Sequence, residues 1–262
     1  MQISLHEVEG QTLRVGIRRG DKARPPLLIF NGIGANIELV QPFLDALDGP
    51  EAIIFDVPGV GGSPSPWLPY RPSTLARLSA QLLDKLGHAQ VDVLGLSWGG
   101  ALAQQFAFQQ GGRCRRLVLA ATSPGHLMVP AKLTVLLKMA TPRRYKDSKY
   151  MERIAGDIYG GALRGSPELV HSYLRHVRWS SDYGYYLQLL AGCGWTSLPW
   201  LRLLAQPTLV MAGTDDPIVP MVNAQILAKL IPDSRLATID DGHLFLITRA
   251  QDSADIISEF LN

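Results

Sequence analysis

The chain has 262 residues and a mass of 28.7 kDa, which is long enough for one sizeable core with a smaller inserted element. Hydrophobic residues make up 47% and charged residues 18% of it, a composition that fits a globular protein and excludes a disordered one. The formal net charge of +2 is too small to indicate nucleic acid as a partner. No apolar run approaches the roughly 18 residues that a transmembrane span needs.

The N-terminus and the two cysteines bear on the compartment. The first residues do not form a basic stretch followed by an apolar run, so no secretory signal is predicted. Cys114 and Cys193 allow at most one disulfide, and neither has the spacing of a metal ligand. We therefore expect a cytoplasmic protein, although a secreted form without its signal would show the same features.

Short apolar runs alternate with amphipathic stretches over much of the chain. Alternation over 12–17 predicts an antiparallel edge hairpin, and helices are expected over 73–86 and 98–110. The predicted buried strands, in chain order, are 27–30, 52–55, 91–94, 117–120, 207–211 and 235–239. This pattern predicts an α/β fold in which helices cover both faces of a mostly parallel sheet.

The segment 124–200 interrupts this rhythm. Strand signals vanish there, and ten Tyr and Trp residues gather in it. We expect a mainly helical cap, or lid, inserted between two parts of an α/β core, 1–123 and 201–262. The cap holds ten Lys and Arg against five Asp and Glu. This excess indicates either a solvated charged face or attraction to an anionic surface or product.

The most informative stretch runs from Gly95 to Gly100 and contains a Gly-x-Ser-x-Gly pattern centred on Ser97. It follows a predicted strand and opens a predicted helix, which is the context in which this pattern indicates a nucleophile. A sharp strand-to-helix turn would strain the serine backbone, and side chains at Gly95 and Gly99 would collide with neighbouring backbone. The turn predicts an exposed serine hydroxyl beside a helix N-terminus, where developing negative charge is favoured.

A serine hydroxyl becomes a good nucleophile only when a base takes its proton. His243 follows the last predicted strand, and the carboxyl ends of parallel strands share one edge of a sheet. We therefore expect His243 to meet Ser97 at that edge. The other five histidines lack such a position and are expected on the surface or in the cap.

The imidazole needs a carboxylate that holds it in one tautomer. Asp215 and Asp216 both follow the preceding strand, and the chain order Ser, Asp, His is typical of the α/β-hydrolase fold. Asp216 is the preferred candidate, while spacing alone leaves Asp215 open. Asp56 also ends a strand, but its Pro- and Gly-rich surroundings favour a role in fixing a turn.

Acyl transfer also needs N–H donors for the oxyanion. The N–H of Trp98 follows the nucleophile directly, and the Gly-rich loop at 31–35 favours the N–H of Ile33 as the second donor. A plain glycine-rich turn is the alternative reading of that loop. No nucleotide-binding fingerprint and no metal-ligand cluster is present, so no cofactor and no metal is expected.

The sequence resembles the intracellular poly(3-hydroxyalkanoate) depolymerases that act on medium-chain-length polymers. The stretches that carry the resemblance lie in the core and in the cap, and they are 27–36, 55–63, 97–106, 158–161, 194–197 and 240–250. The resemblance implies an α/β hydrolase with Ser97 as nucleophile, Asp216 as acid and His243 as base.

The resemblance also implies a substrate, an aliphatic polyester or medium-chain ester, and a possible partner, the surface of a polyester granule. The enzyme would release 3-hydroxy acids or short oligomers through an acyl-enzyme on Ser97. A cap rich in Trp, Tyr and Leu fits an apolar entrance. Three alternatives stay open from sequence: a hydrolase or lactonase of small soluble esters, a hydroxyacyl transferase, and a non-catalytic receptor.

Overall fold

A computed structural model describes all residues from 1 to 262 and contains one eight-stranded sheet. The strand order is β1-β2-β4-β3-β5-β6-β7-β8, and the six strands from β3 to β8 run parallel, with β1 and β2 antiparallel at one edge. The strands are β1 (Gln2–Val8), β2 (Gln11–Arg18), β3 (Leu27–Phe30), β4 (Ala52–Phe55), β5 (Val91–Leu96), β6 (Cys114–Ala120), β7 (Thr208–Gly213) and β8 (Ser234–Ile239).

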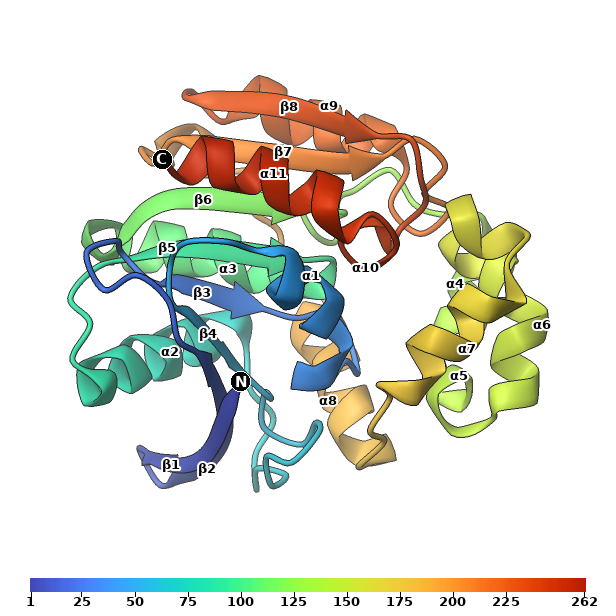
Figure 1. Cartoon of the computed structure of the whole chain (residues 1–262), viewed down its shortest axis with the longest axis horizontal. Helices are drawn as coiled ribbons and strands as arrows, with labels where there is room; N and C mark the ends of the chain where they lie inside the picture. Colours follow the sequence, from blue (N-terminus) through green and yellow to red (C-terminus); the bar gives the residue numbers. More distant parts are fainter.

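Helices cover both faces of the sheet. Figure 1 shows α1 (Gln41–Ala46), α10 (Phe245–Thr248) and α11 (Ala250–Leu261) in front of it, and α3 (Trp98–Gln109) and α9 (Met221–Leu230) behind it. The face that bears α3 also packs α2 (Pro72–Leu86), which ends at Gly87 in the left-handed conformation that terminates many helices.

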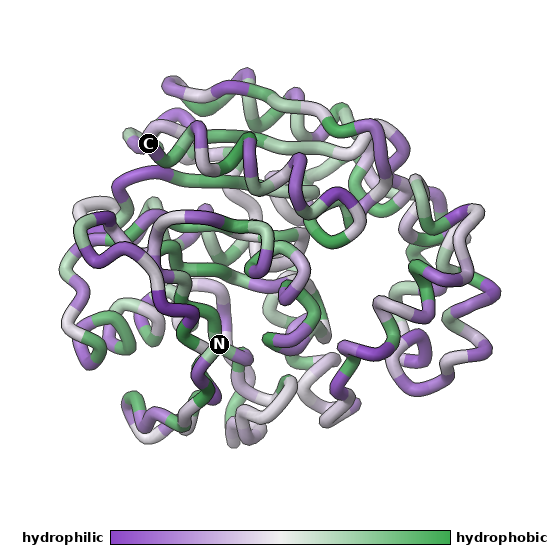
Figure 2. Tube along the Cα trace, viewed as in Figure 1, coloured by the Kyte–Doolittle hydropathy of each residue, from purple (hydrophilic) through white to green (hydrophobic).

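The strands are buried on both faces because successive side chains point to opposite sides of a sheet. In β3, Leu28 and Phe30 belong to a cluster of 34 buried residues with α2 and α3. Leu27 and Ile29 belong instead to a cluster of 22 buried residues with α1 and α11. The tube in Figure 2 is accordingly hydrophobic along the central strands.

A helical lobe lies between β6 and β7. It consists of α4 (Leu133–Met139), α5 (Arg143–Lys146), α6 (Ser148–Tyr159), the 3-10 turn η3 (Gly161–Arg164), α7 (Pro167–Arg175) and α8 (Asp182–Gly192). Figure 1 shows α4 to α7 beyond the carboxyl ends of the parallel strands. These helices share a third cluster of 14 buried residues. By contrast, Leu187 and Ala191 of α8 pack into the larger core cluster.

The segment 124–200 leaves and rejoins the core at neighbouring points, because Gly125 and Thr196 form an isolated antiparallel bridge. This bridge supports our proposal that 124–200 is one inserted cap, with α8 as the helix that fastens it to the core.

The predicted core elements are confirmed to within a few residues. The predicted helix at 98–110 ends at Gln109, and Gly111–Arg113 forms a short 3-10 turn beyond it. None of the helices has the length and hydropathy that crossing a bilayer requires. Both cysteines carry free thiols.

Candidate active site

Ser97 occupies the sharp turn between β5 and α3. Its backbone has φ 54° and ψ −119°, a strained conformation for a residue with a side chain. The flanking glycines are required by close packing, because a Cβ on Gly95 would lie 2.5 Å from the Gly99 carbonyl oxygen. A Cβ on Gly99 would lie 2.1 Å from the carbonyl oxygen of Phe30. The predicted steric reason for this glycine spacing is therefore confirmed.

His243 joins Ser97 to Asp216 through two hydrogen bonds. Its Nε2 lies 2.9 Å from Ser97 Oγ, and its Nδ1 lies 2.7 Å from Asp216 Oδ2. A carboxylate only accepts, so Nδ1–H donates to Asp216 and Nε2 accepts the Ser97 hydroxyl proton. His243 is 3% exposed, and its ring stacks on Tyr159 with ring centroids 6.2 Å apart. The structure thus brings together the three residues that the sequence selected.

The two neighbouring aspartates face different partners. The second oxygen of Asp216 accepts hydrogen bonds from the backbone N–H groups of Ile218 and Val219, which fix the carboxylate beside the imidazole. Asp215 turns away and accepts two hydrogen bonds from Arg164, at 2.7 and 3.0 Å. The Arg164 guanidinium lowers the pKa of Asp215 below its usual range. The geometry therefore favours Asp216 over Asp215 as the partner of His243.

Two backbone N–H groups beside Ser97 are free to meet an oxyanion. Trp98 opens α3, so the helix supplies no acceptor for its N–H. The N–H of Ile33 donates to no backbone or side-chain acceptor. The Ile33 loop lies close to the nucleophile, because a Cβ on Gly32 would be 3.7 Å from Ser97 Cβ. Both donors expected from sequence are therefore available at this place.

Cap side chains hold the loop that carries Ile33. The Tyr145 hydroxyl donates to the Ile33 carbonyl over 2.7 Å. The N–H of Gly34 donates to Gln188 Oε1, also over 2.7 Å, and Gly34 has φ +70°. Trp98 Nε1 donates in turn to the Gln188 carbonyl. The orientation of the Ile33 N–H thus depends on residues of the inserted segment.

The cap also meets the core at the loop that carries His243. The N–H of His243 donates to the Tyr159 carbonyl over 2.7 Å. Buried Asp241 accepts from the Ala162 N–H, at 2.7 Å. The approach is so close that a Cβ on Gly161 would lie 1.8 Å from Asp241 Oδ1. This contact gives a physical reason for the Tyr-Gly-Gly stretch that carried the family resemblance in the cap.

A cavity opens beside Ser97 and contains about 390 Å³ of empty space, including its mouth. Ten of its fifteen lining residues are hydrophobic, and both core and cap contribute to them. Leu39 and Leu244 come from the core, while Met139, Tyr145 and Tyr173 come from the cap.

A second hollow, with about 510 Å³ of empty space including its open mouth, adjoins this cavity. The two share four lining residues, which are Leu39, Tyr173, Leu244 and Ile247. It lies between α7 on one side and α1 and α10 on the other, and these helices face each other across the front of the molecule in Figure 1. The site therefore continues into an outer groove in which six of the ten lining residues are hydrophobic.

Comparisons with known proteins agree with this geometry. The model of a family described as the alpha/beta hydrolase fold matches residues 25–250. A poly(3-hydroxyalkanoate) depolymerase from Ectopseudomonas oleovorans is 56% identical over 97% of this chain and 90% of its own length. The chain belongs to the α/β-hydrolase family, within the poly(3-hydroxyalkanoate) depolymerases. It is a serine carboxylic-ester hydrolase.

More distant relatives of this hydrolase share its fold over nearly the whole chain. A 3-oxoadipate enol-lactonase from Acinetobacter baylyi is 25% identical over 88% of this chain and 86% of its own. A crystal structure of a hydrolase from Pseudomonas aeruginosa PA01 has a TM-score of 0.82 and 25% identity, and it covers 99% of this chain and 98% of the other.

Sequence reasoning missed several residues of the hydrolase site. Tyr145, Gln188 and Arg144 lie in the cap, far from Ser97 along the chain, and no local pattern distinguishes them from other polar cap residues. Asp241 was visible as the residue two positions before His243, but the hydrogen bond that it accepts from Ala162 of the cap depends on tertiary packing. The chain has no group of three or more His, Cys, Asp or Glu side chains placed to hold a metal ion.

Proposed function

We propose that this hydrolase cleaves medium-chain-length poly(3-hydroxyalkanoate) through an acyl-enzyme on Ser97. The observation that carries the proposal is the hydrogen-bonded series Ser97–His243–Asp216 at the wall of an apolar cavity. The 56% identity to a depolymerase supports the choice of a polyester as substrate.

The first half of the reaction forms the acyl-enzyme. Ser97 Oγ bonds to the ester carbonyl carbon while His243 Nε2 takes the hydroxyl proton. The carbonyl oxygen becomes an oxyanion that the N–H groups of Ile33 and Trp98 stabilise. The ester C–O bond then breaks, and His243 returns the proton to the leaving oxygen, which departs as an alcohol.

The second half releases the acid. Water attacks the acyl carbon, and His243 takes one of its protons. The bond to Ser97 Oγ breaks, the proton returns to Ser97, and a 3-hydroxy acid or oligomer departs. Asp216 stabilises the imidazolium in both halves and keeps the ring in the required tautomer.

The apolar walls favour a medium-length alkyl side chain. The cavity at Ser97 and the adjoining groove share four residues, three of them aliphatic, so a chain of several methylenes can pass from one to the other. Each buried methylene contributes about 0.8 kcal/mol, so six additional methylenes contribute at most about 5 kcal/mol. Side-chain length is therefore expected to control the rate.

A series of p-nitrophenyl esters tests this preference. We expect kcat/KM to rise from the two-carbon to the eight-carbon ester by about two orders of magnitude, less than the full burial would allow. Emulsions of medium-chain polyester should also be degraded faster than poly(3-hydroxybutyrate). A flat or falling series, with poly(3-hydroxybutyrate) preferred, would leave the chemistry of Ser97 standing and remove the substrate proposal.

Hydrolysis of a small soluble ester or lactone is the second candidate function, and the similarity to an enol-lactonase over 88% of the chain favours it. The two functions separate when polymer emulsion and soluble esters or lactones are compared at equal enzyme concentration. Turnover of the soluble compounds without release of acid from the polymer would select the second function.

We also propose that α4 contacts the surface of the polyester granule. Leu133 and Leu137 are 70% and 63% exposed, and their spacing of four places them on one side of the helix together with exposed Leu136. Met139, the last residue of the same helix, lines the cavity at Ser97, so this apolar stripe ends close to the site. Exposed apolar stripes of this kind are typical of contact surfaces.

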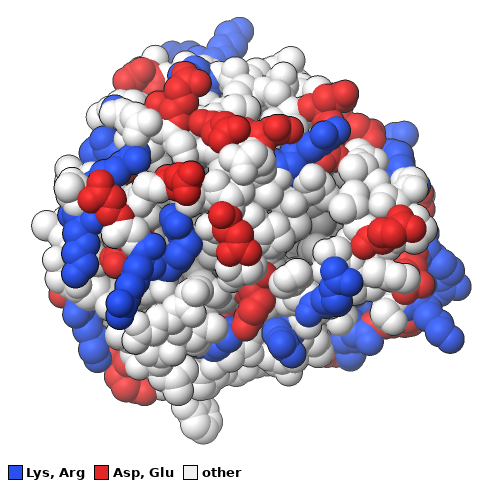
Figure 3. Space-filling view, viewed as in Figure 1, with Lys and Arg blue, Asp and Glu red and all other residues white.

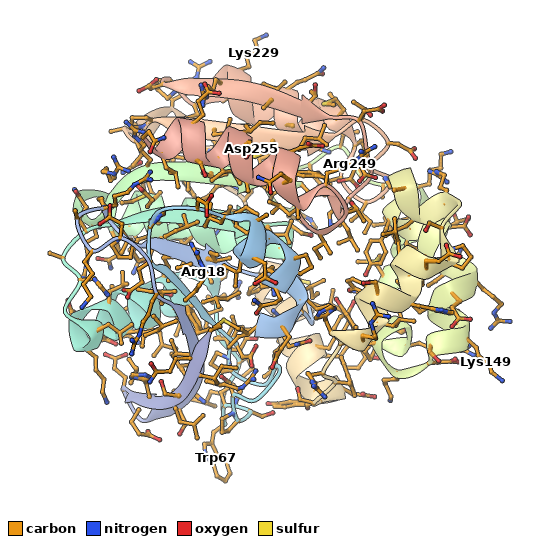
Figure 4. The ribbon with its side chains drawn as sticks, in the orientation of Figure 1. Arg18, Trp67, Lys149, Lys229, Arg249 and Asp255 are labelled. Carbon is orange, nitrogen blue, oxygen red and sulfur yellow. The ribbon has the colours of Figure 1, made fainter.

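Substituting Leu133 and Leu137 together by Ser tests this contact. We expect polymer emulsion to be hydrolysed at least about fivefold more slowly while soluble esters react at an unchanged rate. Trp67→Ser is the matched control, because Trp67 is 98% exposed and points outward at the bottom of Figure 4, away from the cap. A loss of polymer hydrolysis in Trp67→Ser alone would place the contact on that loop instead.

A further inference from the structure

Arg144 is a buried cation in the wall of the cavity at Ser97. It belongs to α5, is 1% exposed, and lines the same cavity as Ser97 and His243. Arginine keeps its charge at any pH at which a protein is folded. A buried charge normally has a carboxylate partner. No Asp or Glu oxygen lies within 4.0 Å of the Arg144 guanidinium.

The other cations of the cap lie at its surface, and several of them do have such partners. Three ion pairs at its surface join Lys138 to Asp157, Arg143 to Asp147 and Lys146 to Asp182. The basic side chains of this region lie along the right-hand edge of Figure 3. Most of the basic residues of the cap therefore form a solvated charged face, which is the first of the two interpretations of their excess given above. Arg144 is the exception.

The hydrogen bonds of Arg144 leave part of its donor capacity unused. Its Nη1 donates to the Tyr185 hydroxyl at 2.6 Å and makes two long contacts of 3.5 Å with the carbonyls of Met139 and Thr141. Its Nε is buried and donates to nothing. A guanidinium has five N–H donors in a planar fork, so these contacts satisfy only one side of it.

Tyrosine side chains surround the guanidinium without neutralising it. Arg144 lies over the rings of Tyr145 and Tyr185, at 4.5 and 5.2 Å from the ring centroids. Burial raises the pKa of Tyr159, Tyr173 and Tyr185 above the usual range, so these phenols stay neutral. The aromatic faces attract the cation, but they leave its net charge without an anion.

We propose that Arg144 binds the free carboxylate of a 3-hydroxy acid, either at the end of a polyester chain or in the released product. The inference rests on the proposed ester hydrolysis at Ser97. A carboxylate supplies two oxygens in the plane of the guanidinium fork and the missing negative charge. Since Arg144 and Ser97 line one cavity, a chain end bound there presents the ester bond nearest that end to the nucleophile. The enzyme would then shorten the polymer from its carboxyl terminus.

The test uses the linear dimer of 3-hydroxyoctanoate in two forms, the free acid and its methyl ester, with p-nitrophenyl octanoate as a neutral reference. A charge-assisted contact should give the wild type a kcat/KM about 10- to 100-fold higher on the acid than on the methyl ester. Arg144→Gln should bring that ratio close to one, whatever its absolute rate. Arg143→Gln is the matched control, because Arg143 is exposed and outside the cavity, and it should keep the wild-type ratio.

If Arg144→Gln fails to fold, inhibition of the wild-type enzyme tests the role of Arg144. In that case, 3-hydroxyoctanoate should inhibit p-nitrophenyl ester hydrolysis at least about tenfold more strongly than methyl 3-hydroxyoctanoate. Equal rates on the two dimers and equal inhibition by acid and methyl ester would overturn the role of Arg144. If the wild type hydrolyses neither form of the dimer nor the p-nitrophenyl ester, the proposed function itself is overturned.

Discussion

The core and the cap contribute to the site in different ways. The core holds Ser97, Asp216 and His243 at the carboxyl ends of parallel strands, and each lies in a short loop whose backbone is tightly packed. The cap supplies no member of that series. It supplies Tyr145 and other side chains that line the cavity, hold the Ile33 loop and bear the unpaired cation.

This difference shows how one molecule assigns the chemical reaction and the choice of substrate to different regions. Geometry at a strand end is fixed by the sheet, so the same chemistry can serve many esters. The cap packs around a cluster of 14 buried residues, all but Leu39 and Leu244 its own, so its lining can vary while the sheet stays the same. Substitutions of Ser97, Asp216 or His243 should therefore lower turnover of every ester alike. Substitutions of cap side chains that line the cavity without holding the Ile33 loop should change which ester reacts fastest.

Loss of the nucleophile should have the largest effect. Ser97→Ala is expected to lower ester turnover by about six orders of magnitude, equally for short and long esters. Circular dichroism and thermal unfolding should show an intact fold. Substantial activity in folded Ser97→Ala, on any ester of the series, would contradict the role given to this residue.

Loss of the Asp216 carboxylate should have the second largest effect on turnover. Asp216→Asn should lower kcat by about 10⁴-fold, because the imidazole then loses the acceptor that fixes its tautomer. Asp215→Asn is the matched control at the neighbouring position. It should lose an exposed ion pair with Arg164, while the amide oxygen can still accept the hydrogen bond from the Gly161 N–H. Equal losses in the two variants, or a larger loss in Asp215→Asn, would mean that the acid has been assigned to the wrong residue.

The contact between core and cap can be broken at Gly161. A methyl group there would collide with Asp241, and the backbone has φ +51°. Gly161→Ala should lower the free energy of unfolding by about 2 kcal/mol or more. Gly112→Ala, where an added Cβ meets nothing within 4 Å, should stay within about 0.5 kcal/mol of the wild type. Chemical denaturation measures both, and similar stabilities for the two variants would count against tight docking at Gly161.

Removing one cap hydroxyl should have the smallest effect. Tyr145→Phe breaks the hydrogen bond to the Ile33 carbonyl, and the oxyanion donor next to it loses part of its orientation. We expect kcat to fall about tenfold, with KM changed less. Tyr183→Phe, at a half-exposed cap position, serves as control. A fall confined to KM would mean that Tyr145 contacts the substrate rather than orients the loop.

The sequence predicted the core better than the cap for physical reasons. The strands and the turn at Ser97 depend on local patterns, namely apolar runs and a glycine spacing that only a sharp turn requires. The position of His243 after the last predicted parallel strand then distinguished it from the other five histidines. In the cap, the buried position of Arg144 results from packing against tyrosines up to 41 residues away, so a run of Arg-Arg-Tyr gave no sign of it.

Asp215 and Asp216 combine a position that the local sequence pattern predicts with partners that depend on tertiary packing. Both follow the same strand, and spacing could not separate them. Their partners come from different regions, because Asp216 faces His243 of the core while Asp215 faces Arg164 of the cap. Only the three-dimensional arrangement assigns each carboxylate to its partner.

Covalent labelling with an octyl fluorophosphonate tests most directly the claim that the core turn carries the nucleophile and opens into an apolar cavity. Peptide mapping after brief exposure should find one adduct, on Ser97, in the wild type and none in Ser97→Ala. The corresponding ethyl reagent should label Ser97 at least about tenfold more slowly, because it buries fewer methylenes. An adduct on another residue, or continued ester hydrolysis by protein that is fully labelled at Ser97, would contradict the account.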